Sequence, residues 1–369
     1  MRAIFYDGWP LAYRPNSPAA LHLLTLLAYH PAALQAVVGL PAASFHELPE
    51  GVLPRLAPTP DTPAGLLNWE QRKLPRLAQA EGASCIHQVG GGLPLLGTAA
   101  RIYSPIDWAA GRPAQERPRR LADRLREALA QGGLARARVA LWPADLPAPE
   151  SEVPLQRLPP IVHPAFVALE EADGLNARAQ AALADLHLPQ TYVLYHGPTG
   201  PADLQHLAEA WHWAAGAIGE QYPLLLAGVH GAAVERVDRW LDQNHLRQTV
   251  RRLPRLPVQA LARLYQACSA ILHPARTPVW GGSLRLGLAC GKPVAALEDK
   301  WSDGLVGPAG YLAKPESGGR GLGAALLTLV VEEHVATSLS QSARQRAASW
   351  SGQDFAEALL ALYTKLDRS

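Results

Sequence analysis

Short apolar runs alternate with longer amphipathic segments along most of this chain. An apolar run between turn residues predicts a buried strand, whereas apolar residues spaced three and four apart predict a helix. In the first half, the pattern predicts strands over Ala3–Tyr6, Leu34–Leu40, Ser84–Val89, Arg101–Tyr103 and Ala137–Trp142. It predicts helices from Ser17-Pro18 through Leu27, over Asn68–Glu81 and over Pro118–Gln131, and an irregular excursion over Pro41–Pro63.

The second half repeats this alternation. Its predicted strands are Tyr192–Tyr195, Leu224–Ala227, Gln248–Arg251, Cys268–Pro274 and Val294–Leu297. Its predicted helices are Ala177–Leu186, Asp203–Ala217, Val234–Asn244, Pro257–Cys268 and Asp354–Leu366. Repeated strand–helix–strand units are typical of parallel sheets covered by helices on both faces. We therefore expect an α/β fold with two Rossmann-like, doubly wound parallel-sheet domains that face a central cleft.

The chain length and one proline-rich stretch suggest where the domains meet. At 369 residues the chain suits two domains of about 150–180 residues each. Residues 143–160 are rich in proline and lack periodicity, which indicates a linker. We predict a first domain over residues 1–160 that includes this linker, and a second domain over 161–350. A helix over 351–369 is expected to pack back on the first domain.

Charge and cysteine content narrow the class of protein. The formal net charge is +2, so nothing indicates an electrostatic surface for nucleic acid. Cys85, Cys268 and Cys290 lie in apolar contexts without metal-ligand spacing, which predicts buried free thiols and a cytoplasmic protein. No apolar run reaches the length of about 18 residues that a transmembrane helix needs. No carboxylate pair or His/Cys cluster has the spacing of a metal site.

The segment Pro278–Ala296 carries the clearest chemical signal. Gly281-Gly282-Ser283 follows a predicted buried strand and opens a short apolar helix that stops at Gly291. A glycine pair at such a turn leaves backbone N–H groups uncrowded at a helix N-terminus, which suits an anion. In an open α/β sheet these turns face the ligand crevice at the carboxyl ends of the strands. The alternative interpretation is a tight turn without a ligand.

Several stretches of the sequence resemble one enzyme family. Ala289-Cys290-Gly291-Lys292-Pro293-Val294 is similar to the end of the signature block of group-1 retaining glycosyltransferases, glycosyltransferase family 4. Tyr192–Gly197 resembles the start of the family's donor domain, and Leu261–Cys268 resembles the helix before its active-site loop. Further segments that resemble the family are Gly307–Leu312, Ser342–Ala347, Trp69–Pro75 and Ala83–His87. The resemblance is nearly complete in the second half and patchy in the first.

The resemblance implies a GT-B fold and transfer of a sugar from a nucleotide-sugar donor to an unknown acceptor, with retention of configuration. It implies no metal and no other cofactor, because cations and a glycine-turn helix neutralise the diphosphate in this family. It also leaves room for a partner glycosyltransferase subunit. The donor-binding residues that it implies are Gly197, Thr199, Gly200, Trp280, Gly281, Gly282, Ser283 and Arg285.

Four side chains are candidates for catalysis. His87 and Asp107 match a histidine and an aspartate of the family. Glu298 and Asp299 come directly after a predicted strand, where the carboxyl ends of a parallel sheet form the crevice. A structural histidine and exposed loop carboxylates are the alternative interpretations. Arg285 is likewise a candidate phosphate ligand or a solvated helix residue.

The sequence has uncharged residues at several positions where the family has charged side chains that bind the donor. Two family glutamates fall on Pro278 and Leu286, and an arginine falls on Pro198. A charged hydrogen bond contributes about 1.5–3 kcal/mol, so each lost carboxylate weakens donor binding by about 10- to 150-fold. A second hypothesis is therefore a catalytically inactive GT-B scaffold that acts as a binding or partner subunit. A third is another GT-B-like enzyme, such as a sugar-nucleotide epimerase.

Overall fold

The computed structural model describes residues 3–95, 97, 99–107, 134–167 and 177–367. The chain folds into two compact units. The first unit comprises Met1–Pro15, Ala19–Ile161 and Ser351–Ser369, and the second comprises Asn16–Pro18 and Val162–Trp350. The helix that the sequence predicts over Pro118–Gln131 lies outside the described residues.

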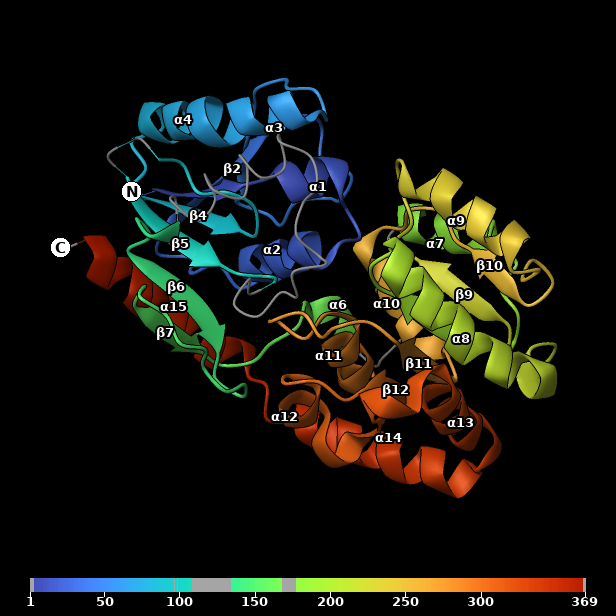
Figure 1. Cartoon of the computed structure of the whole chain (residues 1–369). Helices are drawn as coiled ribbons and strands as arrows, with labels where there is room; N and C mark the ends of the chain where they lie inside the picture. The colour runs from blue at the N-terminus through green and yellow to red at the C-terminus, as the bar shows by residue number, and fades with distance from the viewer. Residues whose placement is uncertain (1–2, 96, 98, 108–133, 168–176, 368–369) are drawn as a thin grey trace. The chain divides into compact units, whose positions relative to one another are not determined.

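A parallel seven-stranded sheet forms the centre of the first unit (Figure 1). Its strand order is β3-β2-β1-β4-β5-β6-β7, so the order reverses between β1 and β4. The strands are β1 (Ala3–Asp7), β2 (Gln35–Leu40), β3 (Leu53–Leu56), β4 (Cys85–Val89), β5 (Ala100–Ser104), β6 (Val139–Pro143) and β7 (Leu155–Leu158). Strand β1 is buried along its whole length, as its uninterrupted apolar sequence predicts.

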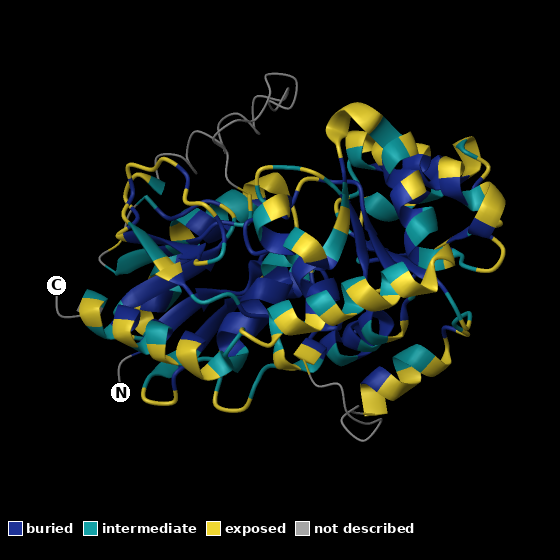
Figure 2. Ribbon diagram, turned by 90° about the horizontal axis from the view of Figure 1, so that it is seen from below, coloured by how far each residue is buried: buried dark blue, intermediate teal, exposed yellow. Residues whose placement is uncertain are grey.

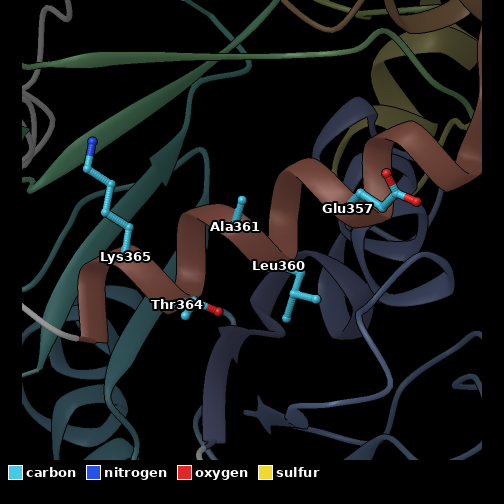
Figure 3. A pocket seen from close by; sticks show the side chains of 5 residues that line it. All are labelled: Glu357, Leu360, Ala361, Thr364 and Lys365. Carbon is cyan, nitrogen blue, oxygen red and sulfur yellow. The ribbon is translucent and has the colours of Figure 1, made fainter.

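Helices cover both faces of this sheet. Phe5 faces one side, where it clusters with Trp69 and Leu74, and Tyr6 faces the other, where it bonds Tyr363 of the last helix. The helices of the unit are α1 (Trp9–Tyr13), α2 (Pro18–Ala28), α3 (Pro63–Asn68), α4 (Leu74–Ala80) and α15 (Gly352–Asp367). The outer face of α15 carries a shallow apolar pocket of about 450 Å³ lined by Leu360 and Ala361 (Figure 3).

Two edge strands form in proline-rich stretches for which the sequence predicts no strand. Strand β3 lies within Pro41–Pro63, and β7 lies within the predicted linker 143–160. An edge strand needs ladder hydrogen bonds on one side only, so it tolerates Pro54 within it or prolines beside it. The segment 143–160 is therefore part of the first sheet as well as a connection.

The predicted helix Asn68–Glu81 is interrupted. Residues Trp69–Lys73 form a π-helical turn, η1, between α3 and α4. Pro75 has no N–H to donate to the preceding turn, and the N–H of Leu74 donates to the Trp69 carbonyl five residues back. A π turn accommodates such a gap in the hydrogen-bond ladder.

The second unit contains a parallel six-stranded sheet with the order β10-β9-β8-β11-β12-β13. This order also reverses, between β8 and β11. The strands are β8 (Val193–His196), β9 (Leu224–Ala227), β10 (Val250–Arg252), β11 (Ala270–His273), β12 (Val294–Leu297) and β13 (Gly310–Ala313). Most of these strands are short and buried, so most of the exposed surface lies on helices and loops (Figure 2).

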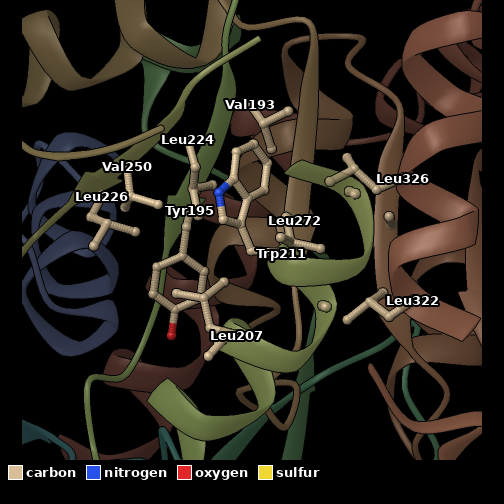
Figure 4. Packing of buried hydrophobic residues seen from close by; sticks show 14 of the residues in the cluster. Val193, Tyr195, Leu207, Trp211, Leu224, Leu226, Val250, Leu272, Leu322 and Leu326 are labelled. Atoms are coloured by element: carbon tan, nitrogen blue, oxygen red, sulfur yellow. The ribbon is translucent and has the colours of Figure 1, made fainter. Parts of the chain in front are cut away.

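One face of this second sheet packs against α8, α9 and α13. Trp211 of α8 lies among Val193, Leu224 and Leu326, all of them buried (Figure 4). The helices of the unit are α6 (Pro164–Val167), α7 (Ala177–Ala184), α8 (Pro201–Ile218), α9 (Ala233–Gln243), α10 (Val258–Ala267), α11 (Gly282–Ala289), α12 (Ser302–Val306), α13 (Gly318–Val331) and α14 (Glu333–Ala347). Two doubly wound parallel-sheet units confirm the α/β expectation.

No single helix among the described residues is both long and apolar enough to cross a bilayer. The pair Pro315–Val331 and Glu333–Leu366 meets the length and composition test only together, with a bend of 96° between them. Leu322, Leu326 and Leu329 of the first segment are buried in the core of the second unit.

Candidate functional site

The reversal of strand order between β8 and β11 defines a candidate ligand site in the second unit. Connections to either side of such a point diverge, which leaves room at the carboxyl ends of the two strands. Strand β8 ends at His196 and continues into the loop at 197–200, and β11 ends at His273 and continues into the loop at 274–281. The predicted donor-binding residues lie in these two loops and in the start of α11.

The glycine turn requires glycine at two successive positions. Gly281 and Gly282 have φ values of +81° and +47°, in the left-handed region. A Cβ on Gly281 would lie 2.7 Å from Cβ of Arg285, and one on Gly282 would lie 2.8 Å from Cγ of Pro278. Both the backbone conformation and the close neighbours therefore exclude larger residues.

This turn presents backbone donors at the start of α11. The N–H groups of Leu284 and Arg285 already donate to the carbonyl of Gly281, at 3.1 and 3.3 Å. The N–H groups of Gly282 and Ser283 have no partner among the described residues. The first turn of a helix favours negative charge, so this geometry suits a phosphate group.

A buried polar network, which the sequence pattern does not predict, lies beside the turn. Ser283 Oγ lies 2.9 Å from His273 Nδ1, and the Tyr265 hydroxyl lies 2.8 Å from His196 Nδ1. His196 Nε2 lies 2.6 Å from the carbonyl oxygen of Asn16. Burial lowers the pKa of His196 and of His273 to about 4 in each case, so both are neutral at physiological pH. The only sequence signal was that each histidine ends an apolar strand.

The loop after β8 contains the predicted residues Gly197, Thr199 and Gly200. The N–H of Gly200 donates to Asp203 Oδ2 at 3.2 Å, which caps helix α8. Arg236 of α9 donates to the carbonyl of Thr199 at 2.9 Å. A guanidinium therefore lies beside the loop that contains Pro198.

Arg285 is buried, which excludes the alternative of a solvated helix residue. Its side chain is 1 % exposed. Nε donates to the carbonyl of Trp280 at 3.2 Å, and the guanidinium carbon lies 5.0 Å from the ring centre of Trp350. These contacts hold the glycine turn against the end of the second unit, and Trp280 itself is only 6 % exposed.

The two carboxylates after β12 differ in their surroundings. Asp299 Oδ1 accepts from the N–H groups of Trp301 and Ser302 at 2.8 and 2.7 Å, and Oδ2 accepts from that of Thr277 at 2.7 Å. Asp299 therefore ties the loop before α11 to the start of α12. Glu298 is exposed, and its backbone N–H extends the ladder to Ala313.

Replacement of Asp299 by alanine should lower the free energy of unfolding by about 1–3 kcal/mol, because three partly buried N–H groups lose their acceptor. Glu298→Ala is the matched control and should change stability by less than about 0.5 kcal/mol. Urea denaturation of the two variants measures both values. Equal stabilities would show that the Asp299 hydrogen bonds do not support this loop.

His87 and Asp107 lie in the first unit. The His87 side chain is 0 % exposed, with Nδ1 at 2.8 Å from the Tyr363 hydroxyl and Nε2 at 2.8 Å from Ser104 Oγ. Burial lowers its pKa to about 3. With both nitrogens engaged, His87 connects β4, β5 and α15 and has no nitrogen directed at solvent. Asp107 is exposed and lies in the loop after β5.

Side chains that ligate metals are dispersed in both units. Across the described ranges, no group of three or more His, Cys, Asp or Glu side chains is placed to hold a metal ion. The three cysteines are free and buried.

Two Rossmann-like units, each built on a parallel doubly wound sheet, define the GT-B fold. Solved structures of this fold are similar to almost the whole chain. The glycosyltransferase WaaG, involved in lipopolysaccharide biosynthesis, has a TM-score of 0.71 at 14% identity over 98% of this chain and 99% of its own. Sucrose-phosphate synthase from Thermosynechococcus elongatus has a TM-score of 0.69 at 16% identity, over 99% of both chains.

A third similar structure is Anabaena HepE, solved in complex with UDP and glucose. It has a TM-score of 0.68 at 14% identity, over 99% of both chains. No family model matches this chain, and no curated protein sequence matches it. At these identities the likeness establishes the fold, and the fold alone does not define the reaction.

Proposed function

We propose that this chain binds a nucleotide-diphosphate sugar in its second unit and transfers the sugar, with retention of configuration, to an acceptor. The observation that carries the proposal is the turn at Gly281-Gly282, which presents two backbone donors at the strand-order reversal between β8 and β11. The UDP bound by the similar HepE structure supports a nucleotide in this fold.

In this proposal the diphosphate lies against the N–H groups of Gly282 and Ser283. Arg236 supplies positive charge beside the loop at 197–200. No metal ion takes part, because backbone donors and a guanidinium neutralise the leaving phosphate. The neutral His273 positions the glycine turn through its hydrogen bond with Ser283. The neutral His196, at the end of β8, is held by its hydrogen bond with Tyr265.

The second candidate function is a non-catalytic subunit that binds a nucleotide sugar or a partner. Pro278 and Leu286 favour it, because neither side chain accepts a hydrogen bond. Asp299 has little capacity left to replace the missing carboxylates, since its two oxygens already accept three backbone N–H groups. The two candidates agree on where the donor binds and differ in turnover.

Calorimetric titration with UDP-, GDP- and ADP-sugars tests donor binding. One of these nucleotide sugars should bind, and Gly282→Val should weaken binding at least tenfold, because a side chain there collides with Pro278 and displaces the N–H donors. Gly318→Val is the matched control: Gly318 has φ +55° and nothing within 4 Å of its Cβ position.

Failure of every nucleotide sugar to bind at millimolar concentration would refute the donor site. Equal weakening by the two valine variants would place the phosphates elsewhere. Where binding is found, release of free nucleotide in the presence of acceptor mixtures separates the enzyme from the non-catalytic subunit.

A further inference from the structure

A surface pocket of about 520 Å³ lies at the amino ends of the strands in the second unit, beside the edge strand β10. We call it the β10 pocket. Its lining includes Pro189 before β8, Pro223 before β9 and Thr249 before β10. The candidate donor site lies at the opposite, carboxyl ends of these strands. A strand of four residues such as β8 rises about 13 Å, so the two sites are separate.

Positive charge is concentrated in the β10 pocket. Arg247, Arg251 and Arg252 contribute to its lining, and Asp238 is the only carboxylate among these described lining residues. Three arginines against one aspartate give the lining a formal charge of +2, as large as that of the whole chain. A pocket lined by one sign of charge raises the local concentration of ligands of the opposite sign. The lining therefore favours an anion.

Arg251 is held in place without being neutralised. Its guanidinium donates to the carbonyl of His187 at 3.2 Å and to that of Leu186. These two carbonyls follow helix α7, and His187 ends the turn with φ +46°, in the left-handed region. Both acceptors are uncharged, and within the described ranges no carboxylate is paired with Arg251. The guanidinium is thus oriented before a ligand arrives, and it keeps its full charge.

The other two arginines have carboxylate partners near the surface. Arg247 Nη2 donates to Asp242 Oδ2 at 2.9 Å, and the two side chains are 54% and 60% exposed. Arg252 Nε donates to Asp238 Oδ1 at 3.2 Å, which occupies the one carboxylate of the lining. Exposed ion pairs are weak, because solvent screens them and two flexible side chains must be ordered. A phosphate with more than one negative charge can therefore compete for Arg247.

The remainder of the lining is largely apolar, which restricts the body of the ligand. Pro189, Pro223, Leu225 and Leu241 contribute this part. A guanidinium matches the oxygens of a phosphate group with two parallel N–H donors. The C–H face of a sugar ring can pack on prolines, whereas a second charged group would lose solvent there without a partner. The volume of the pocket lies within the range of about 300–1,000 Å³ that is usual for small-molecule sites.

We propose that the β10 pocket is a second ligand site, for a small phosphate monoester of an uncharged ring such as a sugar phosphate. Arg251 and Arg247 bind the phosphate, and the ring packs on Pro189 and Pro223. This site does not depend on the proposed donor site, because the two lie at opposite ends of the strands.

Ligand-detected NMR titration of the full chain tests the proposal. D-Glucose 6-phosphate or D-ribose 5-phosphate should bind at least tenfold more tightly than D-glucose, D-ribose and inorganic phosphate. Arg251→Gln should weaken that binding at least tenfold and Arg247→Gln at least fivefold, because each removes a cation from the lining. Arg239→Gln is the matched control and should leave it unchanged. Arg239 is also exposed, but it lies on α9 outside the lining, where Nε donates to the Glu235 carbonyl at 3.3 Å.

Three results would overturn the proposal: no binding of either sugar phosphate, equally tight binding of the free sugars or of inorganic phosphate, or unchanged binding to both Arg251→Gln and Arg247→Gln. Gly282→Val should bind the sugar phosphate normally, and loss of binding there would place the phosphate in the donor site instead. Sugar-phosphate binding by a chain with no affinity for nucleotide sugars would refute the donor site and leave the β10 pocket standing. Circular dichroism checks that each variant is folded, and Arg247→Gln decides the test if Arg251→Gln is not.

Discussion

Acidification from about pH 7 to about pH 4 should remove several kcal/mol of folding free energy. Burial lowers the pKa of His87 to about 3 and that of His196 and His273 to about 4, against an ordinary value of 6.5. Between these values the unfolded chain binds protons that the folded chain does not, so stability falls as the pH falls. A histidine pKa that is lower by one in the folded chain corresponds to about 1.4 kcal/mol.

The combined effect of three histidines with lowered pKa values is comparable to the whole free energy of unfolding of a typical domain, about 5–15 kcal/mol. Asp7 acts in the opposite sense, since burial raises its pKa, but it is one group against three. Urea denaturation over this pH range measures the slope, and His87→Gln should flatten it because glutamine does not titrate. A free energy of unfolding that is constant over the range would contradict the burial of these histidines.

Tyr363→Ala should lower the free energy of unfolding of the first unit by about 3–5 kcal/mol. The Tyr363 ring is 2 % exposed, and its hydroxyl lies 2.9 Å from that of Tyr6 and 2.8 Å from His87 Nδ1. The substitution removes the ring that packs α15 against the sheet and leaves His87 Nδ1 without a partner, whereas the Tyr6 hydroxyl keeps His30 Nδ1 at 2.9 Å. Denaturation monitored by hydrogen exchange in α15 measures the effect.

Tyr363→Phe separates the two contributions. It keeps the ring and removes the hydroxyl, so it should cost about 1–3 kcal/mol, the penalty of leaving the buried His87 Nδ1 without a hydrogen bond. If alanine and phenylalanine cost the same, the ring contributes nothing to the packing of α15. If neither variant loses stability, α15 is not anchored at this position.

The regular pattern of the chain predicted most of the second sheet, because apolar runs such as Ile271–Leu272 leave little choice between strand and loop. The edge strands β3 and β7 were not predicted because prolines surround them in the sequence. Strand propensity does not show that a segment pairs with a single neighbouring strand, as β3 does with β2 and β7 does with β6. The π turn at Trp69–Lys73 was missed because helical periodicity is almost the same on either side of it.

The candidate site was predictable where the backbone defines it. Two successive glycines at a strand-to-helix turn indicate positive φ, and Gly281 and Gly282 have it. The hydrogen bonds of the histidines were not predictable. The sequence of an apolar strand that ends in His196 does not show that Tyr265 lies beside it in space. The role of Asp299 was hidden for the same reason, since Thr277 lies twenty-two residues away.

Neither compact unit is a continuous piece of chain, and this affects the order in which the protein folds during synthesis. The sheet of the first unit is complete once β7 has emerged, yet α15, which covers Tyr6 and His87, follows the entire second unit. At about 5–20 residues per second the first unit waits roughly 10–40 s for this helix. During that interval the face of the sheet that α15 covers is exposed, and truncation after residue 350 should leave it exposed permanently.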